Sequence, residues 1–161
     1  RSAKMNTAIR EAKLEDVAAL VDMMQRAHAD AGFALDRELA NAAFTTLLRD
    51  RSRGVVWIAR RDLKPEGYIV VTLKLSMESG GIDAFIEDLF VYRDARRKGV
   101  GSALVSAAMA DCRRAGVSAV HVETGADDEA TAAFYAACGL KNRNHTILTS
   151  VLRENPLARP L

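Results

Sequence analysis

Cysteine is scarce in this sequence: Cys112 and Cys138 are the two that occur among 161 residues. Their positions lack the spacing of metal ligands, which argues against a disulfide scaffold and against a zinc site. We interpret both as packed or idle thiols in a reducing cytoplasm. A nucleophilic Cys138 is the alternative, but no pattern of histidine and carboxylate partners accompanies it.

Long hydrophobic runs and a marked excess of one charge are also missing. No apolar run approaches the roughly 20 residues of a membrane span, and no signal-peptide pattern opens the chain. The formal net charge is +2, but residues 1–4 precede Met5 and are interpreted as a vector remnant. Without Arg1 and Lys4, basic and acidic residues are equal in number. The sequence therefore predicts a cytoplasmic protein with no membrane and no nucleic-acid partner.

What is present is the composition of one globular domain. Hydrophobic residues make up 49% of the chain and charged residues 27%, which is typical of such domains. The length suffices for one domain with a substantial core and is too short for two ordinary ones. We predict a single domain over residues 5–155 and a frayed tail over 156–161.

The hydrophobic pattern alternates between the period of strands and the period of helices. Strands are predicted over 7–11, 55–59, 68–73, 82–92, 119–123, 140–144 and 146–152. Helices are predicted over 14–27, 36–48 and 100–115, and from Asp127 or Asp128 to 138, with Asp36 as the N-cap of the second. The fold class is α/β in the α+β sense: a mixed, mostly antiparallel central sheet of 6–7 strands with helices on both faces. The last two strands could pair across a homodimer.

Residues 96–102, Arg-Arg-Lys-Gly-Val-Gly-Ser, form the most informative motif. They lie between a predicted strand and a predicted helix. Glycine lets the backbone approach a ligand closely, and the first N–H groups of a helix attract an anion. The three basic side chains add long-range attraction. The motif therefore predicts binding of a phosphorylated cofactor.

Three features in this order resemble the GCN5-related N-acetyltransferases. Arg96–Gly101 fits the family's Gln/Arg-x-x-Gly-x-Gly/Ala pyrophosphate loop, and Glu87–Val91 resembles the strand before that loop. Ala130–Leu140 is similar to the late helix with its Phe-Tyr pair. The resemblance spans about Ile9 to Leu152 and implies the acyl-CoA N-acyltransferase fold of that family.

The resemblance also implies transfer of an acetyl group from acetyl-CoA to a primary amine of a small molecule, by direct attack in a ternary complex. Polyamines, aminoglycosides, aminoalkylphosphonates and amino acids are candidate acceptors. A protein or peptide N-acetyltransferase and a non-catalytic CoA-binding regulatory module are the alternatives. The cofactor-binding residues implied by the resemblance are Leu89, Phe90, Val91, Arg96, Arg97, Lys98, Gly99, Val100, Gly101, Ser102 and Asp128.

Two catalytic residues follow from the resemblance, Glu87 and Tyr135. Glu87 is the first choice for the base that takes the amine proton, and Glu123 is the second. Asp88 should point to the opposite face of a regular strand and be structural. Tyr135 matches a tyrosine that protonates the departing thiolate, and Phe134 is assigned to the core. No metal is expected.

Asp128 departs from the family pattern, because many relatives carry asparagine there. Aspartate caps a helix equally well but repels a phosphate, so a cap and a cofactor contact both stay open. His121, in an apolar strand, is interpreted as a satisfied core residue. Arg113 and Arg114 should face solvent.

Overall fold

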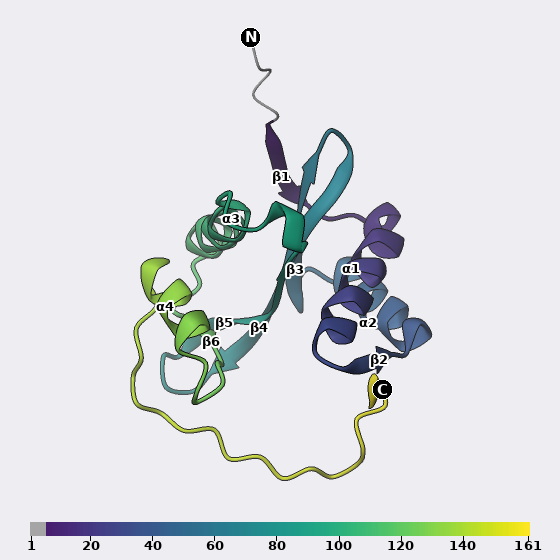
Figure 1. Cartoon of the computed structure of the whole chain (residues 1–161). Helices are drawn as coiled ribbons and strands as arrows, with labels where there is room; N and C mark the ends of the chain where they lie inside the picture. The colour runs from purple at the N-terminus through teal and green to yellow at the C-terminus, as the bar shows by residue number, and fades with distance from the viewer. Residues whose placement is uncertain (1–5) are drawn as a thin grey trace.

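A five-stranded sheet forms the centre of the protein in the computed structural model, which describes residues 6–161 (Figure 1). The suggested vector remnant therefore lies outside the described residues. The strand order is β1-β3-β4-β5-β6; β5 and β6 are parallel and the other pairs antiparallel. The strands are β1 (Thr7–Glu11), β3 (Gly54–Arg61), β4 (Lys64–Ser76), β5 (Gly81–Val91) and β6 (Val120–Val122).

Helices cover both faces of this sheet, as the sequence predicts. Figure 1 shows α1 and α2 on one side of the strands and α3 and α4 on the other. A 3-10 turn over Leu14–Asp16 precedes α1, and another over Arg93–Ala95 follows β5. The helices are α1 (Val17–Asp30), α2 (Arg37–Arg49), α3 (Val100–Arg114) and α4 (Glu129–Ala137). Within residues 6–161, no helix has the length and apolar character needed to cross a membrane.

The core is divided into two apolar clusters by the sheet. Successive side chains of a strand point to opposite faces, so Tyr68 and Val70 of β4 pack towards α1 and α2. Ile69 and Val71 pack towards α3 and α4. Because β4 is covered on both faces, its sequence is an almost continuous apolar run.

Polar contacts position the helix starts and the edge of the sheet. The side chain of Asp36 accepts a hydrogen bond from the Leu39 amide at 3.1 Å, which confirms it as the N-cap of α2. Asp16 is buried and forms ion pairs with Arg10 at 2.7 Å and with Arg60 at 2.9 Å. These two pairs connect the turn before α1 to strands β1 and β3.

The C-terminal region differs from the prediction. Residues 141–157 form no strand, so the predicted strands 140–144 and 146–152 are wrong and the central sheet has five strands instead of 6–7. The apolar side chains of this stretch, such as Leu148 and Leu152, are exposed. Their alternation indicates strand propensity, but a strand also needs a neighbour to pair with. The homodimer predicted from these strands stays a prediction.

The end of the chain is also better ordered than expected for a frayed tail. Strand β7 (Ala158–Pro160) pairs antiparallel with β2 (Phe33–Leu35), the short strand that connects α1 to α2 in the chain. The Asp36 amide donates to the Leu157 carbonyl at 2.8 Å, and the Leu161 amide donates to Gly32 at 3.0 Å. Figure 1 shows the extended segment running from α4 to this short pair of strands.

Candidate functional site

Strand β5 has an unpaired edge over its last five residues. Its pairing with β6 ends at Ile86, whereas its pairing with β4 continues to Val91. The Tyr92 amide, just after β5, donates to the Glu66 carbonyl of β4 at 2.9 Å. Because N–H groups alternate in direction along a strand, the Val91 N–H points to the unpaired edge. An extended ligand could add there as a further strand.

The loop after β5 turns the chain directly into α3. Arg97 and Gly99 both have left-handed backbone conformations, with φ of +60° and +81°. This is costly for a residue with a Cβ and easy for glycine. The Gly99 carbonyl accepts from the Ala103 amide at 3.0 Å. The N–H groups of Val100 to Ser102 therefore precede the first bond within the helix and can bind an anion.

Two of the three basic side chains of the loop, those of Arg96 and Lys98, form hydrogen bonds with backbone carbonyls just before it. The Nε of Arg96 donates to the Val91 carbonyl at 2.8 Å, and the Nζ of Lys98 donates to the Asp94 carbonyl, also at 2.8 Å. All three basic residues are exposed. Their positive charge therefore surrounds the start of α3, where the sequence predicts phosphate binding.

Helix α4 packs against the start of α3 through two aromatic residues. A Cβ built on Gly101 would lie 3.4 Å from the ring of Phe134, in ordinary van der Waals contact, so the two helices approach closely here. Tyr135 is 7% exposed and lies at 5.1 Å from Phe134 between ring centroids. Tyr135 is thus the more buried of the two, whereas the sequence assigned Phe134 to the core. Burial, the charge of Asp88 and the neighbouring Cys138 raise the pKa of Tyr135 to about 12.

A cavity of about 960 Å³ opens on the other face of the sheet, where α1 and α2 cover β4 and β5. Both Glu87 and Asp88 line this cavity. The prediction that Asp88 points to the opposite face is wrong, because a β-bulge interrupts the register. Val70 pairs with Asp88 and Val71 pairs with Ile86, which leaves Glu87 as the extra residue. A bulge of this kind redirects the next side chain.

The two carboxylates have different surroundings. Glu87 is exposed and accepts a hydrogen bond from the Thr72 hydroxyl at 2.7 Å. Asp88 is half-buried and accepts a hydrogen bond from the hydroxyl of Tyr68, which is fully buried. Burial raises the pKa of Asp88 above its usual value, although the Tyr68 hydrogen bond and the nearby His28 oppose this shift.

His28 of α1 also lines the cavity. Its Nδ1 lies 2.9 Å from the Met24 carbonyl. A carbonyl can only accept a hydrogen bond, so Nδ1 carries a proton and Nε2 is the free position of the neutral ring. Neither His28 nor Asp88 could be placed at this cavity from the sequence, because neither the bulge nor the packing of α1 against the sheet leaves a local signal.

Other predicted residues lie outside this cavity. Glu123 is exposed, follows β6 and is not among the cavity-lining residues. Asp128 caps α4 by accepting from the Thr131 amide at 3.0 Å, which confirms the cap. His121 contacts Asp83 at 2.8 Å and stacks on Phe85, so its polar group has the predicted partner. Its side chain is 38% exposed on the edge strand β6, so the prediction that it is a core residue is wrong.

Two further predictions concern the surface and the thiols. Arg113 and Arg114 are exposed, as predicted. Cys112 is buried and Cys138 half-buried, and burial raises the pKa of both thiols. Among residues 6–161, no group of three or more metal-binding side chains is placed to hold an ion.

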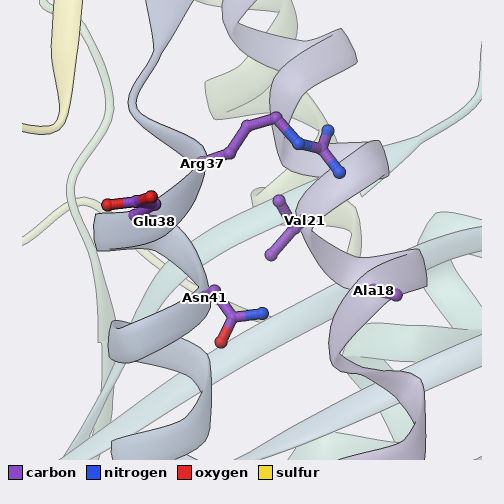
Figure 2. A pocket seen from close by; sticks show the side chains of 5 residues that line it. All are labelled: Ala18, Val21, Arg37, Glu38 and Asn41. Atoms are coloured by element: carbon purple, nitrogen blue, oxygen red, sulfur yellow. The ribbon is translucent and has the colours of Figure 1, made fainter.

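A second, smaller hollow lies between α1 and α2. Its volume is about 340 Å³, and Figure 2 shows Arg37 reaching from α2 towards α1 beside Val21. The Arg37 guanidinium pairs with Asp22 at 2.7 Å. The residues that line this hollow are far in the sequence from the loop at 96–102 and from the bulge at Glu87, and none of them is a predicted site residue.

Known proteins with the same architecture are numerous. A 35% identical integron cassette protein from the mobile metagenome of Cole Harbour salt marsh has a TM-score of 0.84, and the match covers 91% of each chain. The aminoglycoside N-acetyltransferase AAC(6')-Iy, solved in complex with CoA, has a TM-score of 0.81 at 15% identity, covering 95% of this chain and 99% of that one. An aminoglycoside acetyltransferase from an uncultured soil metagenomic sample, bound to sisomicin, has a TM-score of 0.76 at 18% identity, covering 92% and 97%.

Sequence comparison gives the family. No curated protein sequence matches the chain. The profile described as the acetyltransferase (GNAT) family matches residues 17–140, which include α1, the bulge in β5, the loop and α4. This match and the 35% identical structure both cover well over half of the chain. The chain therefore belongs to the acetyltransferase (GNAT) family and is an N-acetyltransferase.

Proposed function

We propose that this protein transfers the acetyl group of acetyl-CoA to a primary amine of a small molecule, by direct attack within a ternary complex. The observation that carries the proposal is the unpaired edge of β5, which is followed by the N–H groups of the first turn of α3, ahead of the first bond within that helix. An extended chain with a phosphate at one end matches both features at once. CoA is such a molecule.

The donor would lie along the edge of β5. Its pantetheine arm would add beside Leu89, Phe90 and Val91, and its pyrophosphate would bind the N–H groups between Arg97 and Ser102. The Val91 N–H would then donate to the thioester oxygen as negative charge develops there. A donor of this kind typically contributes about 100-fold or more in rate. A direct contact of Asp128 with the cofactor stays a prediction.

The acceptor would enter from the cavity between α1, α2 and the sheet. An alkylammonium must lose a proton before its nitrogen can attack, and a carboxylate can take it. Glu87 is the base expected from the sequence, and Asp88 lines the same wall. Glu123 is less well supported because it does not line this cavity. On the donor side, Tyr135 would protonate the departing thiolate.

Two properties favour a cationic acceptor of small size. The cavity wall carries two carboxylates close together, and these attract a positive charge. The solved relatives include enzymes named for aminoglycosides, one of them bound to sisomicin, and a glucosamine-6-phosphate N-acetyltransferase from Arabidopsis thaliana. Those substrates carry amines, which supports the same acceptor class here.

The test is to measure thiol release from acetyl-CoA with a panel of polyamines, aminoglycosides, amino acids and peptides. Turnover with at least one small amine is expected. Turnover only with peptides would favour the peptide acetyltransferase instead. Tight acetyl-CoA binding without turnover for any amine would favour a non-catalytic CoA-binding module.

A further inference from the structure

We infer that Asp88, and not Glu87, takes the proton from the acceptor amine, and that Tyr68 positions the Asp88 carboxylate for this step. The inference rests on the proposed function, because it assigns a role within the same acceptor cavity. It differs from the expectation drawn from the sequence, in which Glu87 is the base and Asp88 is structural.

The bulge in β5 is the first reason. In a regular strand, Glu87 and Asp88 would point to opposite faces. The register shift instead places both on the cavity wall. Along β5, Asp88 is also one residue closer than Glu87 to Leu89–Val91, where the thioester would lie. A proton acceptor needs to lie within hydrogen-bond reach of the attacking nitrogen.

The hydrogen bonds of the two carboxylates are the second reason. Tyr68 is completely buried, and its hydroxyl donates to Oδ2 of Asp88. The ring of Tyr68 is in turn held by Phe44 in an edge-to-face contact at 5.8 Å. Asp88 is therefore anchored through one oxygen to a rigid part of the core. Glu87 has a longer, exposed side chain whose contact is the surface hydroxyl of Thr72.

The electrostatic surroundings are the third reason. Groups from every neighbouring element face Asp88: Tyr68 on β4, His28 on α1 and Glu87 on β5, with Arg53 on the cavity wall beyond α2. The burial of Asp88 and the negative charge of Glu87 raise its pKa, whereas Tyr68 and His28 lower it. A base works best when its pKa lies closer to the working pH. The net upward shift suits Asp88 for this role.

The proton balance of the step is simple. The ammonium gives one proton to Asp88, and the neutral amine nitrogen then forms a bond with the thioester carbon. As the carbon–sulfur bond breaks, the nitrogen loses its second proton to solvent, the thiolate receives one from Tyr135, and Tyr135 regains a proton from solvent. Asp88 then releases its proton to solvent through the open cavity.

The test compares three variants by steady-state kinetics of thiol release, with spermidine, sisomicin and n-butylamine as probe amines at saturating acetyl-CoA. Asp88→Asn keeps an oxygen that can accept from Tyr68. It should lower kcat by about 100-fold or more and abolish the acidic limb of the pH–rate profile. Acetyl-CoA affinity should stay within about threefold of the wild type.

Tyr68→Phe and Glu87→Gln form a matched pair with opposite expected shifts. Removing the Tyr68 hydrogen bond destabilises the ionised Asp88, so the acidic limb should move to higher pH. Removing the Glu87 charge stabilises the ionised Asp88, so the limb should move to lower pH. A merely structural role would not move the limb in opposite directions. Thermal unfolding of each variant controls for loss of the fold.

Two results would overturn the assignment: an Asp88→Asn enzyme within threefold of the wild-type kcat, or loss of the acidic limb in Glu87→Gln instead. If no probe amine is acetylated while acetyl-CoA binds, the proposed function fails. An NMR titration then tests the role of Asp88 independently of turnover. It follows the carboxyl carbon resonance of Asp88, which is assigned by its absence from the spectrum of Asp88→Asn. Its shift on addition of the same amines supports amine recognition by Asp88, and an unchanged resonance refutes it.

Discussion

Gly101 offers the sharpest test of the donor site. It is the second residue of α3 and follows the left-handed Gly99. A Cβ at this position would lie 3.4 Å from Phe134 and 3.8 Å from Val91, so alanine fits in ordinary contact. A glutamate would extend further, into the space over the helix start where the pyrophosphate is proposed to bind.

The expected magnitude follows from charge repulsion. Two unit negative charges about 5 Å apart repel by about 1 kcal/mol in water and by about 3 kcal/mol at an effective dielectric constant of 20. Because a pyrophosphate carries more than one negative charge, Gly101→Glu should weaken acetyl-CoA binding by about 30-fold or more. Gly101→Ala should weaken it by less than about threefold, since it adds one methyl group and no charge.

The fold should survive the same substitution. Glutamate has a higher helix propensity than glycine, by about 0.5 kcal/mol or more. A carboxylate in the first turn also interacts favourably with the helix dipole, by about 0.3–1 kcal/mol. The unfolding temperature of Gly101→Glu should therefore equal or exceed that of the wild type. This separates loss of binding from loss of structure.

The assay is calorimetric titration of acetyl-CoA into the wild type and the two variants, together with thermal unfolding of the free proteins. Retained affinity in Gly101→Glu, within threefold of the wild type, would refute the assignment of the phosphate site to the start of α3. Equal loss in both variants would point to disturbed packing of Phe134 instead of charge repulsion.

Two other predictions concern the acid and the buried ion pair. Tyr135→Phe should slow turnover and leave acetyl-CoA affinity nearly unchanged, and an unaltered rate would remove its acid role. Because the pKa of Tyr135 is about 12, its ionisation should cause no fall in wild-type kcat below pH 10. Asp16→Asn should lower the free energy of unfolding by about 3 kcal/mol at pH 7, since it leaves Arg10 and Arg60 without their carboxylate. Arg10 and a backbone hydrogen bond lower the pKa of Asp16. The stability that ionised Asp16 contributes is therefore fully present above the usual pKa of 3.8 and declines as the pH falls below it. Urea denaturation should show a smaller difference in the free energy of unfolding between the wild type and Asp16→Asn at pH 3 than at pH 7.

Much of the donor side could be predicted because its signals are local. The loop from Arg96 to Ser102 combines glycines with a helix start, and both features can be recognised from consecutive residues. The Asp128 cap is likewise a short-range contact with Thr131. The acceptor side could not be predicted in the same way, because its wall is assembled from α1, α2, β4 and β5.

The errors have the same origin. Asp88 was assigned to the wrong face because a bulge depends on how two strands pair, and a single strand carries no sign of it. The stretch from 146 to 152 has the alternation of a strand, but the structure provides no neighbouring strand for it. In the opposite direction, the tail was expected to be frayed, yet its residues 158–160 find a partner in Phe33–Leu35.

The sequence by itself determined the family, the order of most helices and strands, and the loop and helix start at Gly99–Gly101 where phosphate binding is proposed, since each depends on residues close together in the chain. Only the tertiary structure decided which carboxylates face the acceptor cavity. That choice depends on a register shift between β4 and β5 and on the packing of α1 over them. The side of the enzyme that selects the amine therefore depends on contacts between segments far apart in the sequence.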